Sequence, residues 1–330
     1  MLNGRKSLIT VLASAALVTF VGTIPSGTAQ AQPSVSDVQH RVDRLYHAAE
    51  QASERYNQIH VQLKQMRGDV KALRADESLQ HRRTEQARRV VADAIVQEYE
   101  GDSLSAVGQA VVSQDPSQFV SQLSTMSAFN SLQTSRYASY ITQNKALAIR
   151  QDATASQLAK VAQLEKSAAA DKASIDKNLS DAKALLGNLQ ADARQRLLEA
   201  SRSSTPVPMS DVPASGRAAV AVRFALAQVG KAYVYGAAGP NAYDCSGLMM
   251  AAWGAAGVAL SHSSGAQWGE GTHVSPSQLQ PGDLVFYYSP SQHVGMYIGH
   301  GMIVNAENPS AGIRVTGLYS MPFVGAVRPG

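Results

Sequence analysis

One thiol stands in the 330 residues, that of Cys245. It belongs to the run Tyr243-Asp244-Cys245-Ser246-Gly247, which comes directly before an apolar segment over 248–253. An Asp or Ser before an apolar run is typical of a helix start, so we expect Cys245 at or within the first turn of a helix. The unpaired N–H groups of a first turn carry positive potential, which stabilises a thiolate and predicts a thiol pKa below about 8.5. Cys245 is therefore a candidate nucleophile, and a buried structural cysteine is the alternative.

A thiol nucleophile needs a base, and four histidines follow Cys245 in the C-terminal third of the chain. His262 lies in a Ser/Gly-rich loop, His273 precedes a turn, and His300 stands between two glycines of a hairpin turn. His293 differs because it begins an alternating apolar run, which predicts a half-buried strand whose first residue can face a cleft. If the hairpin is centred on His300, Asn305 comes one same-face step from His293 and can orient its imidazole. Spacing alone also allows both to be ordinary polar residues at strand ends.

Charged residues and glycines are distributed unevenly along the chain. Residues 32–215 hold 43 charged residues and four glycines, whereas residues 216–330 hold nine charged residues and 18 glycines. This difference predicts two domains of different kinds. The net charge of +4 gives no argument for a nucleic-acid binder, and a single cysteine excludes a disulfide scaffold, a zinc site built on thiolates and an iron–sulfur protein.

Residues 1–31 have the pattern of a secretory signal peptide. Arg5 and Lys6 precede an apolar stretch over 8–21, and Ala29-Gln30-Ala31 offers a cleavage site after Ala31. The alternative, a membrane anchor, is disfavoured because a span needs roughly 20 apolar residues. We expect the mature protein to be secreted and extracytoplasmic. An unpaired thiol in an exported protein strengthens the interpretation of Cys245 as a nucleophile.

Residues 32–200 show the heptad pattern of long paired helices. Eleven consecutive apolar or small positions fit one seam: Val38, Val42, Leu45, Ala49, Ala52, Tyr56, Ile59, Leu63, Met66, Val70 and Leu73. The same frame then meets Glu77, Gln80 and Thr84, where we expect a bend or fraying of the pair. A second in-phase segment over 158–189 predicts an antiparallel coiled-coil hairpin.

The segment between these two helices, 100–132, changes in character. Asp115-Pro116-Ser117 reads as a new helix start, and apolar residues recur from Phe119 to Phe129. Two interpretations stay open for this helical tip: a cap that closes the hairpin, or a docking site for a membrane partner. Residues 201–215 are rich in Pro and Ser and predict an extended linker before the C-terminal domain, 216–330.

The C-terminal domain resembles the NlpC family of bacterial cell-wall cysteine peptidases. The resemblance rests on ordered motifs over about a third of the chain: Tyr233-Val234-Tyr235-Gly236, Asp244-Cys245-Ser246-Gly247-Leu248, Pro281-Gly282-Asp283-Leu284-Val285-Phe286, His293-Val294-Gly295-Met296-Tyr297-Ile298-Gly299 and Asn305-Ala306. It implies an α+β papain-like (NlpC-type) catalytic domain preceded by the long α-helical coiled-coil hairpin.

The resemblance also implies roles for individual residues. Cys245 would be the nucleophile, His293 the base, Asn305 the third catalytic residue and Tyr233 an aid to the oxyanion. The residues bordering the substrate groove would be Asp244, Ser246, Ser261, His262, Ser263 and Ser264. The family chemistry needs no metal and no other cofactor.

The whole layout resembles secreted actinobacterial endopeptidases of the Rip type. This implies hydrolysis of the D-γ-glutamyl–diaminopimelate bond in peptidoglycan stem peptides. We also expect the coiled coil to regulate the peptidase, because a linker of about 15 residues, at about 3.3–3.6 Å per residue, reaches some 50 Å and lets the hairpin fold back over the groove. Simple spacing of the domains is the alternative for the hairpin. The resemblance to other coiled-coil wall hydrolases implies that a division-associated membrane complex of the FtsEX type binds the tip. Two other functions stay open: a coiled-coil scaffold or activator whose papain-like domain only binds cell-wall peptides, and an amidase or transpeptidase on the same fold.

Overall fold

Two long helices dominate the N-terminal part of the chain. The computed structural model describes residues 34–100, 116–189, 191–202, 214–289 and 291–330, so the predicted signal peptide, residues 101–115 of the predicted tip and most of the predicted linker lie outside the described residues. Helix α1 spans Val35–Tyr99, α3 spans Pro116–Gly187, and the short α4 spans Ala191–Arg202. Residues 116–132 are therefore the first part of α3 and not a separate helix. None of the described helices is long and apolar enough to cross a membrane.

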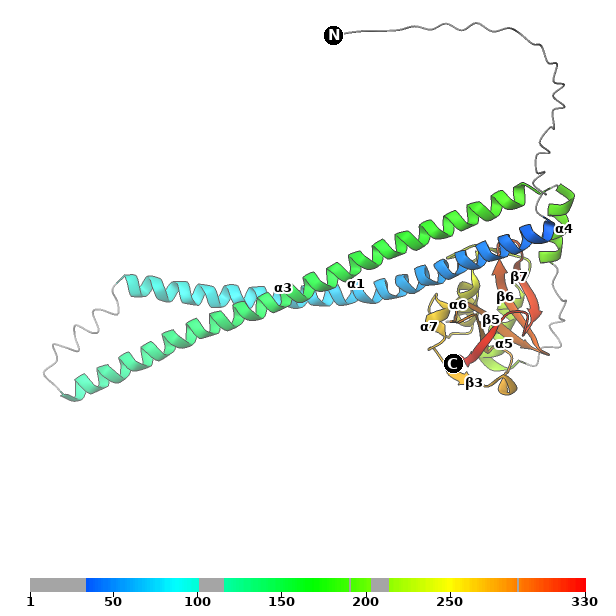
Figure 1. Cartoon of the computed structure of the whole chain (residues 1–330). Helices are drawn as coiled ribbons and strands as arrows, with labels where there is room; N and C mark the ends of the chain where they lie inside the picture. Colours follow the sequence, from blue (N-terminus) through cyan, green and yellow to red (C-terminus); the bar gives the residue numbers. More distant parts are fainter. Residues whose placement is uncertain (1–33, 101–115, 190, 203–213, 290) are drawn as a thin grey trace, which may run out of the picture. The chain divides into compact units, whose positions relative to one another are not determined.

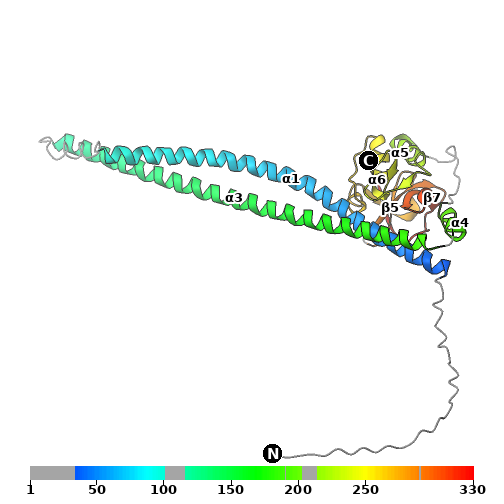
Figure 2. The same cartoon turned by 90° about the horizontal axis from the view of Figure 1, so that it is seen from above.

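Helices α1 and α3 run antiparallel and pack against each other, and in Figure 1 they separate toward the end of α1 and the start of α3 (Figures 1 and 2). The ion pairs between the helices show the antiparallel direction, because a residue later in α1 pairs with a residue earlier in α3. Arg55 pairs with Asp171 at 2.8 Å, and Arg67 pairs with Glu165 at 2.8 Å. These pairs lie at the surface, so they add little to stability; the buried seam between the helices carries the association.

The seam predicted from the heptads is buried at most of its positions. Its members below a tenth exposure are Val38, Val42, Ala49, Ala52, Leu63 and Val70, and Val91 and Ala94 further along α1 are buried as well. At Gln80 and Thr84, where a bend or fraying was expected, α1 is continuous and both side chains are buried in the seam. Gln80 donates from Nε2 to the side-chain and main-chain oxygens of Gln143. The single hydroxyl proton of Thr84 lies between the main-chain oxygens of Gln80, at 3.0 Å from Oγ1, and Gln143, at 3.2 Å. Since these polar groups find partners across the seam, the pair does not fray there.

The C-terminal domain combines three helices with a mixed set of strands. Its elements follow in the order α5 (Gly216–Leu226), β1 (Ala232–Tyr233), β2 (Ala242–Tyr243), α6 (Cys245–Ala255), α7 (Ser264–Gln267), β3 (Thr272–Val274), the 3-10 turn η2 (Pro276–Gln278), β4 (Leu284–Tyr287), β5 (His293–Gly299), β6 (Met302–Asn308), β7 (Gly312–Gly317) and β8 (Phe323–Arg328). Strands β1 and β2 pair in parallel, and the other six form an antiparallel sheet in the order β3-β8-β4-β5-β6-β7. This α+β arrangement, preceded by the long helical hairpin, has the composition of elements expected from the sequence.

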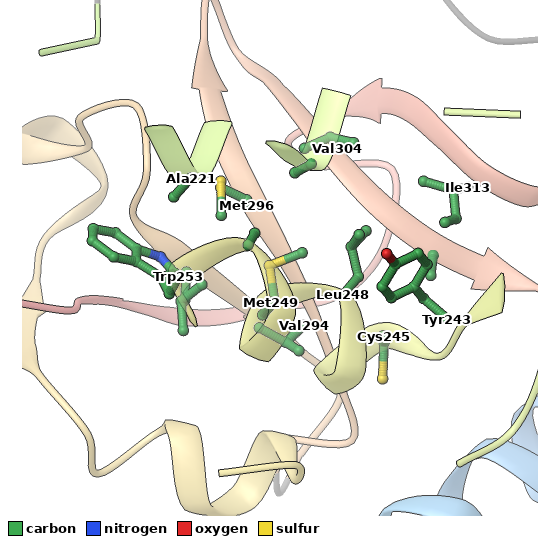
Figure 3. Packing of buried hydrophobic residues seen from close by; sticks show 14 of the residues in the cluster. Ala221, Tyr243, Cys245, Leu248, Met249, Trp253, Val294, Met296, Val304 and Ile313 are labelled. Carbon is green, nitrogen blue, oxygen red and sulfur yellow. The ribbon is translucent and has the colours of Figure 1, made fainter. Parts of the chain in front are cut away.

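The main core lies between α5, α6 and the sheet. Figure 3 shows Leu248 and Met249 of α6 beside Val294 and Met296 of β5, with Cys245 at the edge of the cluster. All five side chains have no exposed surface. Helix α6 is therefore held against β5 along its length, and this packing fixes the position of its first residue relative to the strand that begins at His293.

The hairpin of β5 and β6 sets the spacing of the two polar residues predicted to work together. Met296 pairs with Val304 and Tyr297 with Ile303, and His300 in the turn has a positive φ of 54°. Continuing this register places Asn305 opposite Gly295. A Cβ on Gly295 would lie 3.0 Å from the Asn305 Cβ, so glycine at this position leaves room for the Asn305 side chain.

Candidate active site

Cys245 is the first residue of α6, and Asp244 caps that helix. The Asp244 carboxylate accepts the Gly247 N–H at 2.6 Å and, from the preceding loop, the Gly236 N–H at 2.9 Å. Its oxygens also lie 2.9 and 3.0 Å from Nε2 of His262. Gly247 is required by this crowding, because a Cβ there would lie 2.3 Å from the Ala237 carbonyl oxygen. The loop before α6 is thus tied to the helix start, which fixes where the Cys245 sulfur points.

His293 is held by Asn305. Its Nε2 lies 3.1 Å from Oδ1 of Asn305, while Asn305 Nδ2 donates to Thr316 Oγ1 at 3.1 Å. Because the amide nitrogen is bound to Thr316, the amide oxygen faces the imidazole, which favours a proton on Nε2. The other ring nitrogen, Nδ1, is the one that a carboxylate of α1 reaches. His293 and Asn305 have no exposed surface.

Tyr233 on β1 brings a buried hydroxyl to the same region. Among the described residues this hydroxyl has no hydrogen-bond partner. Burial raises the pKa of Tyr233 well above its ordinary value, and the nearby Glu50 and Cys245 add to the shift. A neutral, unpartnered O–H beside a thiol is free to donate to an oxygen that develops negative charge there.

The predicted groove residues fall into two sets. Ser246, Ser263 and Ser264 point their hydroxyls at side chains of α1, and Asp244 accepts a hydrogen bond from α1 as well as binding His262. Ser261 does not join this set, since its N–H and hydroxyl bind Glu270 at 2.8 and 2.5 Å. The structure therefore gathers the serines around 263–264 near Cys245 and gives Ser261 a place in the loop scaffold.

Helix α1 lies over Cys245 and His293. A hairpin able to fold back over the groove was expected from the length of the linker, but the sequence did not identify the α1 residues that make these contacts. Glu50 binds Nδ1 of His293 at 2.6 Å. Glu54, one turn further along α1, accepts from the thiol of Cys245 at 3.3 Å. Its two oxygens also accept from Ser246 Oγ at 2.8 Å, from Ser264 N at 2.6 Å and from Ser264 Oγ at 2.8 Å.

Further contacts on both sides extend this interface, which we call the closed arrangement. They are Asn57 Nδ2 to Asp244 Oδ2 at 3.0 Å, Ser263 Oγ to Gln58 at 2.7 Å, Gln51 to Gln292 at 2.9 Å, Tyr235 Oη to the Tyr46 carbonyl at 3.0 Å and Ser310 Oγ to Tyr46 Oη at 3.0 Å. Glu50, Glu54 and Asn57 are each less than a tenth exposed. In this arrangement the thiol and the imidazole both have α1 carboxylates where a substrate would lie.

The electrostatics of the closed arrangement oppose a thiolate. Burial raises the pKa of Cys245 well above its ordinary value, and the carboxylates of Glu54, Glu50 and Asp244 raise it further. The expectation of a thiol pKa below its ordinary value is therefore wrong for this arrangement, because burial and three anionic neighbours outweigh the helix start. Burial alone would lower the pKa of His293, but the charge and hydrogen bond of Glu50 reverse this, so its pKa is raised.

The comparison with protein families concerns the same part of the chain. Residues 230–325 match the model of the NlpC/P60 family, and this segment contains the helix start, the strand hairpin and the β1 tyrosine described above. Residues 230–325 are an NlpC/P60 domain. The NlpC/P60 match confirms the family resemblance and the fold class predicted from the sequence.

Named relatives extend the likeness over the same third of the chain. A probable endopeptidase of Corynebacterium glutamicum is 43% identical over 116 residues, which are 35% of this chain and 56% of that protein. A probable endopeptidase of Mycobacterium tuberculosis is 44% identical over 107 residues, 32% of this chain and 28% of that protein. The solved peptidoglycan hydrolase RipB of Mycobacterium tuberculosis is 25% identical, with a TM-score of 0.33, over 43% of this chain and 87% of that chain. The chain thus spans little more than half of the first relative and less than a third of the second.

Proposed function

We propose that this protein is an extracytoplasmic cysteine endopeptidase of the bacterial cell wall. The observation that carries the proposal is that Cys245 begins α6 while His293, bound by Asn305, begins β5, with a ring nitrogen of His293 within 4.8 Å of the Cys245 sulfur. Two of the relatives are named probable endopeptidases, and RipB is named a peptidoglycan hydrolase. We take the substrate to be peptidoglycan stem peptides and the bond to be that between D-γ-glutamate and diaminopimelate.

The proposed reaction is a two-step acyl transfer. His293 takes the thiol proton at Nδ1, and the Cys245 thiolate attacks the γ-carbonyl carbon of the substrate. The Tyr233 hydroxyl donates to the oxyanion that forms, and the His293 imidazolium then protonates the departing amine. Water, activated by the neutral imidazole, hydrolyses the thioester and releases the acyl group. Asn305 keeps the imidazole in the required orientation throughout.

The cradle occupied by Glu54 supports a substrate with a free carboxylate next to the scissile carbonyl. Three donors from Ser246 and Ser264 converge on the Glu54 carboxylate, and its Oε1 lies 3.3 Å from the Cys245 sulfur. A D-γ-glutamyl residue carries its α-carboxylate a few bonds from the γ-carbonyl. The same donors would hold that carboxylate and place the γ-carbonyl at the sulfur.

We further propose that α1 regulates the enzyme by occupying this site. Glu50 and Glu54 bind the two groups that must react, so no substrate can enter until α1 leaves. A closed arrangement of this kind would keep an exported wall hydrolase inactive until a partner draws the hairpin away. That the partner is an FtsEX-type membrane complex, bound through the tip, stays a prediction.

Digestion of purified muropeptides tests the function. The mature protein should release fragments whose new termini, identified by mass spectrometry, are a γ-carboxylate of D-glutamate and an amine of diaminopimelate. Cys245→Ala should release none. Binding of muropeptides without cleavage would indicate a scaffold or activator, and different new termini would indicate an amidase or a transpeptidase.

A further inference from the structure

Three side chains of different chemistry meet where α1 lies on the catalytic pair. One ligand atom each of Glu50, Cys245 and His293 lies within 4.8 Å of the other two, and all three residues are buried. We propose that these residues form a binding site for a thiophilic divalent cation, Zn²⁺, that is complete only in the closed arrangement. The proposal rests on the closed arrangement put forward above, and it adds a ligand that would lock it.

The donor set suits zinc. Thiolate, imidazole and carboxylate are its usual protein ligands, and three protein ligands plus one water make an ordinary four-coordinate site. A thiolate and an imidazole select against Mg²⁺ and Ca²⁺, which prefer oxygen ligands alone.

Asn305 also orients the imidazole for a metal on Nδ1. Asn305 Oδ1 faces Nε2, and its own orientation is fixed by Thr316. A metal-binding histidine commonly donates its second N–H to such a carbonyl oxygen, which leaves the other nitrogen with a free lone pair. Asn305 therefore supports a metal on Nδ1, the nitrogen that Glu50 approaches.

Only small movements separate the observed geometry from a coordinated one. In a tetrahedral site with bonds of about 2.0–2.3 Å, ligand atoms lie roughly 3.3–3.6 Å apart. The Glu50 oxygen and His293 Nδ1 are 2.6 Å apart, so they would separate by under about 1 Å, while the sulfur would move closer. Shifts of this size are within the range of small χ rotations of the Glu50 and Cys245 side chains.

Charge balance favours the cation over the proton. On binding, the thiol proton and the proton shared by Glu50 and His293 leave to solvent, and a thiolate, a carboxylate and a neutral imidazole remain. Their total charge of −2 is cancelled by the metal, so the buried site becomes neutral. Two further carboxylates nearby, those of Glu54 and Asp244, favour a cation in the same place.

The consequence would be a cross-link between the hairpin and the catalytic domain. Glu50 belongs to α1, whereas Cys245 and His293 belong to the C-terminal domain, so a bound Zn²⁺ would hold α1 in place and occupy both catalytic groups. Opening would then require loss of the metal as well as movement of the hairpin.

Cobalt binding to the full-length protein tests the site, because Co²⁺ replaces Zn²⁺ and a thiolate–Co²⁺ bond gives charge-transfer absorption in the near ultraviolet. We expect one Co²⁺ per chain with this absorption, displacement by Zn²⁺, and loss of the absorption in Cys245→Ser. Glu50→Gln should weaken binding by about tenfold or more, because a direct ligand is lost. Glu165→Gln removes a surface carboxylate of the hairpin and should change nothing.

A further variant separates ligation from closure. Glu54→Gln loosens the closed arrangement but keeps all three ligands, so it should retain tighter Co²⁺ binding than Glu50→Gln. Hydrogen exchange over residues 46–58 of α1 should slow when Zn²⁺ is added to the wild type and stay unchanged in Cys245→Ser. Absence of the thiolate absorption would overturn the proposal. So would a loss of Co²⁺ affinity in Glu50→Gln that is no larger than the loss in Glu54→Gln. Neither readout involves cleavage, so a failure here leaves the proposed peptidase, assayed with a chelator present, unaffected.

Discussion

Glu54 is the residue whose removal should open the enzyme most directly. In the closed arrangement its carboxylate accepts three hydrogen bonds from Ser246 and Ser264 and a fourth contact from the thiol of Cys245. Glu54→Ala deletes all four contacts at once and leaves the catalytic residues themselves intact. We expect the variant to react faster than the wild type with both substrate and alkylating reagent.

The size of the effect follows from these contacts. Hydrogen bonds to a charged group are worth about 1.5–3 kcal/mol each, but burying the carboxylate costs several kcal/mol, so the sum is not the net value. Removing one member of such a buried network usually costs about 2–5 kcal/mol. Ser264 Oγ also lies 2.6 Å from the Ser291 carbonyl oxygen, so its single proton can turn to that oxygen when Glu54 is gone, which favours the lower part of that range. A shift of about 2–4 kcal/mol changes the ratio of closed to open protein roughly 30- to 1,000-fold.

Iodoacetamide provides the cleanest assay, because Cys245 is the only thiol in the chain. The thiol has no exposed surface in the closed arrangement, so its alkylation, followed by intact mass, reports the open fraction. The alkylation rate of Glu54→Ala should exceed that of the wild type by up to the predicted change in the closed-to-open ratio. The increase is limited once most of the protein is open. Muropeptide turnover should rise in parallel. Glu165→Ala, which removes a surface ion pair with Arg67, serves as the control and should match the wild type. Equal alkylation rates in Glu54→Ala and the wild type would refute the reasoning.

Three other perturbations have defined outcomes. Asn305→Ala should lower kcat/KM roughly 10- to 100-fold, less than loss of His293, because water can partly replace one orienting hydrogen bond; an unchanged kcat/KM would remove Asn305 from the site. Gly247→Ala should lower the free energy of unfolding in urea by about 1–3 kcal/mol, since its Cβ would lie 2.3 Å from the Ala237 oxygen; a change below about 0.5 kcal/mol would contradict this. Raising the pH should open the protein. The pKa of His293 is raised in the closed arrangement, so its protonation stabilises that arrangement. This stabilisation is complete below the ordinary pKa of 6.5 and is lost as the pH rises through the raised pKa of the closed arrangement. The pKa of Glu54 is also raised in the closed arrangement, so its ionisation favours opening as well. The alkylation rate should therefore rise more steeply with pH in the wild type than in Glu54→Ala. Parallel plots of alkylation rate against pH for the two proteins would contradict this coupling between protonation and closure.

Local pattern predicted much of the fold and the relation between His293 and Asn305. The heptad frame identified most of the buried positions of α1 because a coiled-coil seam depends on residue type and spacing alone. The strand pair followed for a similar reason, since the turn at His300 and the alternation of β5 fix the register. Spacing could not predict whether the helices stay paired at Gln80 and Thr84. That depends on whether these polar side chains find hydrogen-bond partners on the opposite helix.

The carboxylates of α1 could not have been predicted in the same way. Glu50 and Glu54 stand one turn apart, a spacing that a solvated helix face shows equally well. Their burial depends on a domain that begins more than 150 residues later in the chain. The predicted lowering of the thiol pKa failed for the same reason, since the sequence reveals the helix start at Cys245 but not the acidic side chains brought to it by the tertiary fold.

The most direct test of the central claim compares muropeptide cleavage by three full-length proteins under one condition: wild type, Glu54→Ala, and Glu54→Ala with Cys245→Ala. Cleavage is followed over time by mass spectrometry of the new termini. If Cys245 is the nucleophile and α1 holds it closed, Glu54→Ala will cleave at least about tenfold faster than the wild type, and the double variant will not cleave. Cleavage by the double variant would exclude Cys245 as the nucleophile, and equal rates for the first two proteins would show that α1 does not restrain the enzyme.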